Sequence, residues 1–177
     1  MSVTALLGKN LFLLDGGVIN DLLMKVHLIS SPIDWLVNGG TALGAVIAVN
    51  CWVGIPFNML LLTSGLTGIS TDIYESASMD GANAFKRFIY ITLPLMKPAM
   101  LSVLMLGFIY TFKAFDLMYI MTAGGPFNST DVLGTYAYSK AFTQYEFSQG
   151  SAIAMVLFAC LFLVGIFYLK LLSKEDD

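Results

Sequence analysis

Three long apolar runs limit what this chain can fold into more than any other feature. They cover residues 40–62, 99–121 and 151–172 of the 177. Each run reaches the ~20 residues that a helix needs to cross the hydrocarbon core of a bilayer. Over the whole chain 57% of the residues are hydrophobic and only 12% are charged, a balance too apolar for a soluble domain. The sequence therefore predicts an all-α membrane protein with about three transmembrane helices.

The residue content also argues against several classes of function. The net charge is -3 and no basic patch is present, so we expect no nucleic-acid partner. Cys51 and Cys160 both fall inside apolar runs and are interpreted as small buried hydrophobic residues, and His27 is the one histidine, so we expect no metal site. The sequence shows no Ser/His/Asp set and no Walker loop. We therefore expect no catalytic residues, no cofactor and no enzyme.

The loop between the first two apolar runs, residues 63–98, is expected to lie in the cytoplasm. It carries three of the nine basic residues, and cytoplasmic loops of membrane proteins are enriched in such residues. Together with the C-terminal end, this side of the membrane holds five basic residues against three on the other side: Lys86, Arg87, Lys97, Lys170 and Lys174 against Lys9, Lys25 and Lys140.

Local signals predict a helix–turn–helix within this loop. Asp72, with Glu75 three residues later, indicates a capping box that begins a first short helix. Gly81 follows Asp80 and predicts a turn, because glycine adopts left-handed backbone angles without strain. A second helix is indicated by three apolar side chains at helical spacing: Phe85, Phe88 and Ile89.

The loop resembles the EAA loop of ABC-importer permeases. That pattern is Glu-Ala-Ala, three residues, Gly, nine residues, and Ile-x-Leu-Pro; Ser76 replaces the middle Ala here, and six positions match: Glu75, Ala77, Gly81, Ile91, Leu93 and Pro94. A solvated loop with a glycine turn is the simpler interpretation of Asp-Gly alone, but it does not explain the long gapped match. The resemblance implies that this coupling loop (residues 63–98) docks into a cleft of an ATP-hydrolysing subunit. The implied coupling residues are Glu75, Ser76, Ala77, Asp80, Gly81, Ala82, Ile91, Leu93 and Pro94.

Polar residues interrupt the first span, residues 40–62. Pro56 removes a backbone donor and is expected to kink the helix. Asn50 and Asn58 are expected to point away from lipid, where an amide is costly. A structural hydrogen bond between helices, worth ~0.6 kcal/mol in membranes, is the favoured role for Asn58. For Asn50 a role on the solute pathway is equally favoured.

The second span, residues 99–121, contains Lys113 and Asp116 on one helix face. A charge at the bilayer centre costs at least ~2.5–3.5 kcal/mol, so such residues form pairs or line a cavity. One interpretation is a pair near the membrane interface, with Lys113 reaching toward water. In the resembled family, the stretch holding Phe115 and Asp116, just before Thr-x-Gly-Gly-Pro, lies on a helix that lines the substrate pathway.

Two further segments precede and begin the last span, residues 151–172. Thr122-Ala123-Gly124-Gly125-Pro126 is a turn by composition and matches the family's Thr-x-Gly-Gly-Pro. Residues 132–147 are amphipathic and aromatic, which is typical of the membrane interface and also fits a platform for a solute-binding protein. Polar side chains at the outer mouth of the span fit contacts with sugar hydroxyls. The candidate pathway residues are Asn50, Lys113, Phe115, Asp116, Gln149 and Ser151.

The sequence divides into an external segment, residues 1–39, and a permease domain, residues 40–177. Residues 1–14 are apolar but too short to span a bilayer, and we interpret them as the remnant of an upstream span. Complete members of the resembled family carry about three more spans upstream. Because the resemblance runs from about residue 16 to the end, the chain resembles the C-terminal half of a permease.

The resemblance implies a transmembrane permease subunit of an ATP-driven ABC importer in the plasma (inner) membrane. The Gly-Gly-Pro turn and the Tyr-x-Tyr of residues 136–138 resemble the carbohydrate permeases, so the implied cargo is a sugar or sugar-like solute moved inward by alternating access. The implied partners are cytoplasmic ATP-binding subunits, which bind the ATP, a second permease subunit, an extracytoplasmic solute-binding protein and membrane lipid. The alternative is a truncated, non-transporting fragment that acts at most as an assembly partner. A small channel is disfavoured, because no repeated polar ring is present.

Overall fold

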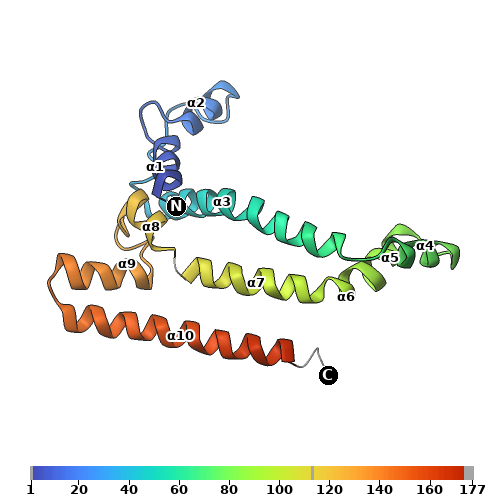
Figure 1. The fold of residues 1–177 in the computed structure, drawn as a ribbon. Helices are drawn as coiled ribbons and strands as arrows, with labels where there is room; N and C mark the ends of the chain where they lie inside the picture. The colour runs from blue at the N-terminus through green and yellow to red at the C-terminus, as the bar shows by residue number, and fades with distance from the viewer. Residues whose placement is uncertain (1, 113, 174–177) are drawn as a thin grey trace. The chain divides into compact units, whose positions relative to one another are not determined.

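The computed structural model describes residues 2–112 and 114–173, and every regular element in this part of the chain is a helix (Figure 1). The predicted all-α class is confirmed. The elements are α1 (Ser2–Leu11), α2 (Val18–Lys25), α3 (Gly39–Thr67), α4 (Thr71–Met79), α5 (Ala84–Arg87), the π-helical turn η1 (Phe88–Thr92), α6 (Leu93–Leu95), α7 (Lys97–Phe112), α8 (Phe115–Thr122), α9 (Leu133–Tyr138), the π-helical turn η2 (Ser139–Thr143) and α10 (Phe147–Ser173). They belong to two compact units, residues 1–53 with 110–164 and residues 54–109 with 165–177.

Two of the described helices are long and apolar enough to cross a membrane, Gly39–Thr67 and Phe147–Lys170. A third span results if the pair Ala84–Leu95 and Lys97–Phe112, bent by 63°, is counted as one. α3 extends five residues past the predicted end of the first span, to Thr67. Thr63 Oγ1 donates to the Met59 carbonyl at 2.8 Å, and the helix runs through Pro56 without interruption.

The predicted second span, residues 99–121, is divided in the structure. α7 ends at Phe112, and α8 begins at Phe115 after the non-helical, buried Ala114 (φ -73°, ψ 60°). As a separate helix, α8 buries Leu117 and Met121 against α1 and α3. Its first turn also holds Asp116, where the positive end of the helix dipole favours a carboxylate. Lys113 lies outside the described residues.

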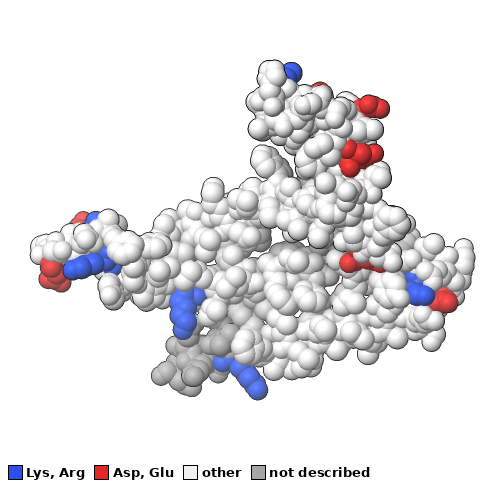
Figure 2. Space-filling view, turned by 180° about the vertical axis from the view of Figure 1, so that it is seen from behind, with Lys and Arg blue, Asp and Glu red and all other residues white. Residues whose placement is uncertain are grey.

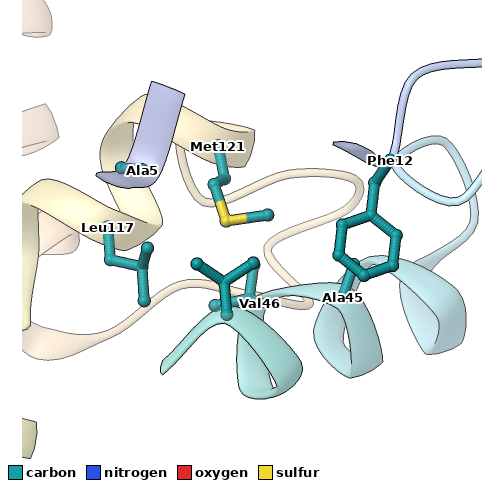
Figure 3. Close-up of a cluster of buried hydrophobic side chains, with 7 residues drawn as sticks. Ala5, Phe12, Ala45, Val46, Leu117 and Met121 are labelled. Carbon is teal, nitrogen blue, oxygen red and sulfur yellow. The ribbon is translucent and has the colours of Figure 1, made fainter. Parts of the chain in front are cut away.

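The first unit has a small core where α1, α3 and α8 meet (Figure 3). Its buried side chains are Ala5, Phe12, Ala45, Val46, Val49, Leu117 and Met121. Small residues permit α1 and α3 to approach each other closely. A Cβ on Gly8 of α1 would lie 2.8 Å from both methyl carbons of Val49. The short apolar segment at the start of the chain therefore packs on α3 and α8 as a helix of 10 residues.

A buried asparagine, which the sequence did not single out, organises the loops around α2. Asn20 is 1% exposed. Its Nδ2 donates to the carbonyls of Leu13 (3.2 Å), Leu14 (3.4 Å) and Ile33 (2.9 Å). Its Oδ1 accepts from the Ile33 amide (3.1 Å) and from Trp35 Nε1 (2.8 Å). One amide side chain thus joins the segment before α2 to the segment before α3.

Asn20→Ala is expected to loosen this external segment, because it leaves several buried groups without partners at about 1–3 kcal/mol each. Amide hydrogen exchange over residues 13–35, in the membrane-inserted chain, should lose protection by about 100-fold, equivalent to ~2.7 kcal/mol. Asn38→Ala is the control, since Asn38 is exposed and accepts one bond, from the Gly40 amide at 3.2 Å. Unchanged protection in Asn20→Ala would contradict the organising role.

The second unit is built on a close contact between α3 and α7. A Cβ on Gly65 would lie 2.6 Å from the Cβ of Ala99, so the two helix backbones approach closely at this point. The hydroxyls of Ser102 and Tyr168 lie 3.1 Å apart and join α7 to α10. Because α4, α5, η1 and α6 connect α3 to α7 along the chain, this contact sets the base from which the coupling loop projects.

Candidate functional site

The first helix of the coupling loop, α4, begins two residues earlier than the sequence indicated. Its N-cap is Ser70, whose Oγ accepts from the Asp72 amide at 3.3 Å. The predicted capping box of Asp72 and Glu75 is therefore wrong: both residues lie within the helix. Ser70 takes the cap because its backbone is extended (φ -61°, ψ 137°) where the chain leaves α3.

The turn after α4 has the geometry of a Schellman motif. Gly81 has φ +78°, its amide donates to the Ser78 carbonyl at 3.1 Å, and the Ala82 amide donates to the Ala77 carbonyl at 2.9 Å. The predicted left-handed Gly81 is confirmed. This geometry explains part of the motif spacing, because Ala77 and Ala82, both half-buried, are the residues that the crossing hydrogen bond joins.

The second helix of the loop is formed by α5, η1 and α6 together. Asn83 caps it, its Oδ1 accepting from the Lys86 amide at 2.9 Å. Ile91 is half-buried in η1, whereas Leu93 and Pro94 are exposed in α6 just before the bend at Met96. Glu75, Ser76, Asp80 and Gly81 are exposed on or after α4.

The coupling loop presents apolar side chains beside charged ones. Figure 2 shows charged side chains of both signs over this loop, at the left of the view, next to a broad uncharged surface. The predicted stripe is exposed, as are two further apolar residues: Phe85 (71%), Phe88 (52%), Ile89 (37%), Met79 (85%) and Tyr90 (76%). An exposed apolar surface rimmed by charges is typical of a protein contact.

Four side chains that the sequence analysis did not identify connect the two helices of the loop. The Tyr74 hydroxyl lies 2.9 Å from Thr92 Oγ1, and Arg87 Nη1 donates to Ser78 Oγ at 2.6 Å. Ser78 Oγ also donates to the Tyr74 carbonyl at 2.7 Å. The spacing of Tyr74 and Ser78, four apart on a helix, is the one signal in the sequence that could have shown them on a common face.

The candidate pathway residues are distributed over three helices. Asn50 is half-buried in α3, and Gln149 and Ser151 are exposed near the start of α10; Asn58, which was not a pathway candidate, is also half-buried in α3. Phe115 is half-buried in α8. The exposed Asp116 accepts a hydrogen bond from Ser2 Oγ at 3.2 Å, an interaction that the sequence did not indicate.

Aromatic rings form a continuous chain in the first unit. Phe115 lies 5.2 Å from both Tyr119 and Tyr138, Tyr119 lies 4.9 Å from Tyr138, and the chain continues through Phe142 (5.1 Å) to Phe147 (6.2 Å), measured between ring centroids. It therefore runs from α8 through α9 and η2 to α10. The aromatic segment recognised in the sequence supplies three of these rings, and α8 supplies the other two.

The predicted turn at residues 122–126 is confirmed. Gly124 has φ +85° and the Gly125–Pro126 peptide bond is cis. The buried Thr130 closes the turn: its Oγ1 donates to the Gly125 carbonyl at 2.8 Å and lies 2.6 Å from Thr122 Oγ1.

Both cysteines and the one histidine of the chain lie among residues 2–112 and 114–173, which the structure describes. No group of three or more His, Cys, Asp or Glu residues that could hold a metal ion occurs there. Cys51 and Cys160 are free thiols. Cys51 is exposed and Cys160 is half-buried, so the expectation that both are buried is wrong.

Comparison with known proteins agrees with these features. The sequence profile of the family described as "Binding-protein-dependent transport system inner membrane component" matches residues 4–174. A probable ABC transporter permease protein of Brucella suis is 34% identical over 163 residues, which are 92% of this chain and 56% of that protein. The trehalose/maltose transport system permease protein MalF of Thermococcus litoralis is 38% identical over 140 residues, or 79% of this chain and 47% of that protein.

A solved structure shares the fold. A bacterial ABC transporter involved in the import of the acidic polysaccharide alginate superposes with a TM-score of 0.84 at 20% identity, over 99% of this chain and 61% of that one. The chain thus spans about half the length of the curated relatives that it matches.

Proposed function

This chain belongs to the family of binding-protein-dependent transport system inner membrane components, and we propose that it is a permease subunit of an ATP-driven importer for a sugar or sugar-like solute. The family is one of inner-membrane transport proteins and not of enzymes. In this proposal the ATP is bound by partner ATP-binding subunits, and the chain needs no cofactor of its own.

The observation that carries the proposal is the folded coupling loop. Its motif residues form a hairpin that ends α4 in a Schellman motif and exposes apolar side chains for a partner. α3 leads into the hairpin and α7 leads out of it, so a force on the hairpin acts on membrane-crossing helices at both ends. Closure of two ATP-binding subunits would then rock the permease between inward- and outward-open states.

The solute class rests on the aromatic chain together with the relatives. The relatives include transport system permease proteins named for trehalose/maltose and for lactose. Sugars present flat C–H faces that stack on aromatic rings, and the exposed Gln149 and Ser151 offer hydrogen bonds to hydroxyls. A solved alginate ABC transporter is in complex with a periplasmic protein that carries an alginate pentasaccharide. An extracytoplasmic solute-binding protein is accordingly a proposed partner, with a second permease subunit.

Uptake by proteoliposomes tests the proposal. The chain alone, with ATP inside, is expected to take up neither labelled maltose nor labelled trehalose, because it has no ATP-binding loop and supplies part of the cavity wall. The complex with ATP-binding subunits, a second permease subunit and a solute-binding protein should take up a sugar only when ATP is present. Uptake by the chain alone would contradict the proposal. ATP-driven uptake that is the same with and without this chain would favour the alternative, a non-transporting assembly partner.

A further inference from the structure

We propose that Tyr74, Ser78, Arg87 and Thr92 form a two-point clamp that fixes the angle between the two helices of the coupling loop. The clamp deepens the proposed function and rests on it: the hairpin transmits ATPase closure to the spans only if it moves as one body. These are positioning residues, since they act on the spans through the helices that they join.

The clamp has two attachment points on each helix. On α4, Tyr74 and Ser78 are four residues apart and share a face. In the first pair the Tyr74 hydroxyl lies 2.9 Å from Thr92 Oγ1, and in the second pair Arg87 Nη1 donates to Ser78 Oγ at 2.6 Å. A single contact would leave the two helices free to pivot about it, whereas two contacts along the same interface fix their angle.

The π-helical turn η1 is what places both partners on one face of the second helix. Arg87 and Thr92 are five residues apart, a spacing that an ordinary α-helix turns to different sides. A π-turn bonds residues five apart, as the Leu93 amide does here to the Phe88 carbonyl, so Thr92 stacks one turn above Arg87. Thr92 Oγ1 lies 3.4 Å from the Arg87 carbonyl, in agreement with this stacking. The π-turn thus brings Arg87 and Thr92 to the same face of the second helix.

An apolar groove lies beside the Tyr74–Thr92 pair of the clamp and strengthens that hydrogen bond, whereas the Ser78–Arg87 bond is exposed to solvent. The groove has a volume of about 610 Å³ and is lined by Tyr74, Arg87 and Thr92 on the loop side and by Met59, Leu62 and Leu66 of α3 on the other. Tyr74, Arg87 and Thr92 are half-buried. Hydrogen bonds in a region of low dielectric are stronger than those in water, and a donor left there without a partner is costly.

The first test measures how rigidly α4 is held relative to α7, the helix that continues the chain after α6, and does not depend on any partner. Spin labels at Met79→Cys of α4 and Leu104→Cys of α7, both exposed (85% and 69%), are placed in the chain with Cys51→Ser and Cys160→Ser, in lipid nanodiscs. Pulsed dipolar spectroscopy should give one narrow distance distribution. Tyr74→Phe and Thr92→Val, which each remove a hydroxyl and keep the side-chain shape, should each lose the narrow distribution.

Two matched variants separate the clamp from a general effect of substitution. Thr92→Ser keeps the hydroxyl and should restore the narrow distribution. Tyr90→Phe removes a hydroxyl from the same π-turn at a ring that is 76% exposed, and should leave the distribution narrow. A distribution that stays narrow in Tyr74→Phe, or that broadens in Thr92→Ser as much as in Thr92→Val, would overturn the clamp.

The second test measures coupling in the complex with its ATP-binding subunits. In Tyr74→Phe and Thr92→Val, labelled maltose or trehalose taken up per ATP hydrolysed should fall by about two- to tenfold, the effect of one lost hydrogen bond. Equal coupling in variants and wild type would contradict the clamp. Failure of the wild-type chain to bind an ATP-binding subunit would instead contradict the proposed function and leave the spectroscopic result unaffected.

Discussion

Gly81→Val is expected to detach the ATP-binding subunits while the membrane spans remain inserted. Gly81 ends α4 at φ +78°, a conformation that costs a residue with a side chain roughly 1–2 kcal/mol, and more for a β-branched one. Among the described residues a Cβ at this position would meet nothing within 4 Å, so the effect does not come from a steric collision with them. The effect comes from backbone strain. If valine at position 81 relaxes to a negative φ, the Schellman hydrogen bonds break and the second helix changes direction.

Co-purification of the ATP-binding subunit with the permease complex measures this effect. The amount of ATP-binding subunit recovered should fall by about tenfold or more, because relief of the backbone strain breaks both Schellman hydrogen bonds. Gly165→Val is the control, because a Cβ on this residue of α10 also meets open space and its backbone is helical. Wild-type recovery in Gly81→Val would show that the coupling loop is not the docking element.

Glu75→Ala should have a smaller effect on the same measurement. The structure assigns the N-cap to Ser70, and Glu75 is an exposed residue of the second turn of α4, so its replacement by alanine, the strongest helix former, changes the stability of the helix by no more than a few tenths of a kcal/mol. A loss as large as that of Gly81→Val would show that the carboxylate itself contacts the ATP-binding subunit.

Gly65→Leu should separate α3 from α7 and destabilise the base of the coupling loop. Even a single Cβ at Gly65 would lie 2.6 Å from the Cβ of Ala99, and neither helix can move away without losing its packing. Overpacking of this kind costs typically 1–3 kcal/mol, and close contacts between small residues are a main source of helix association in membranes.

Thermal unfolding of the detergent-solubilised chain measures this loss. The midpoint should fall by several degrees in Gly65→Leu, and less in Gly65→Ala. Gly165→Leu should leave the midpoint nearly unchanged, because a Cβ at Gly165 meets nothing within 4 Å. Equal midpoints for Gly65→Leu and Gly165→Leu would show that the α3–α7 contact does not support the unit.

The parts of the fold that depend on length and hydropathy could be predicted from the sequence. α3 and α10 are long, predominantly apolar helices, and such runs have one common structure in a bilayer. The coupling loop was recognisable because its motif contains the residue types that the turn requires: Gly81 stands at the one position of the loop with a left-handed backbone.

Other features depend on contacts that no local pattern records. The break between α7 and α8 lies within the predicted second span, and no turn residue marks it; the burial of Leu117 and Met121 against α1 and α3 accompanies it. Ser70 and Asp72 are both good capping residues two positions apart, and the direction of the chain leaving α3 decides between them. Asn20 resembles any polar residue of a short helix until Ile33 and Trp35 are brought to it by the fold.

Site-specific photo-crosslinking tests the central claim, that the coupling loop binds an ATP-binding subunit. A photoreactive phenylalanine analogue replaces Phe85 of the coupling loop (71% exposed) or, as a control, Phe162 of α10 (57% exposed) in cells that express the complete transport system. We expect the analogue at position 85 to crosslink to a protein that carries a Walker nucleotide-binding motif, and the analogue at position 162 to give no such product. Crosslinking of the two positions to the same partners, with no nucleotide-binding protein at position 85, would contradict the account.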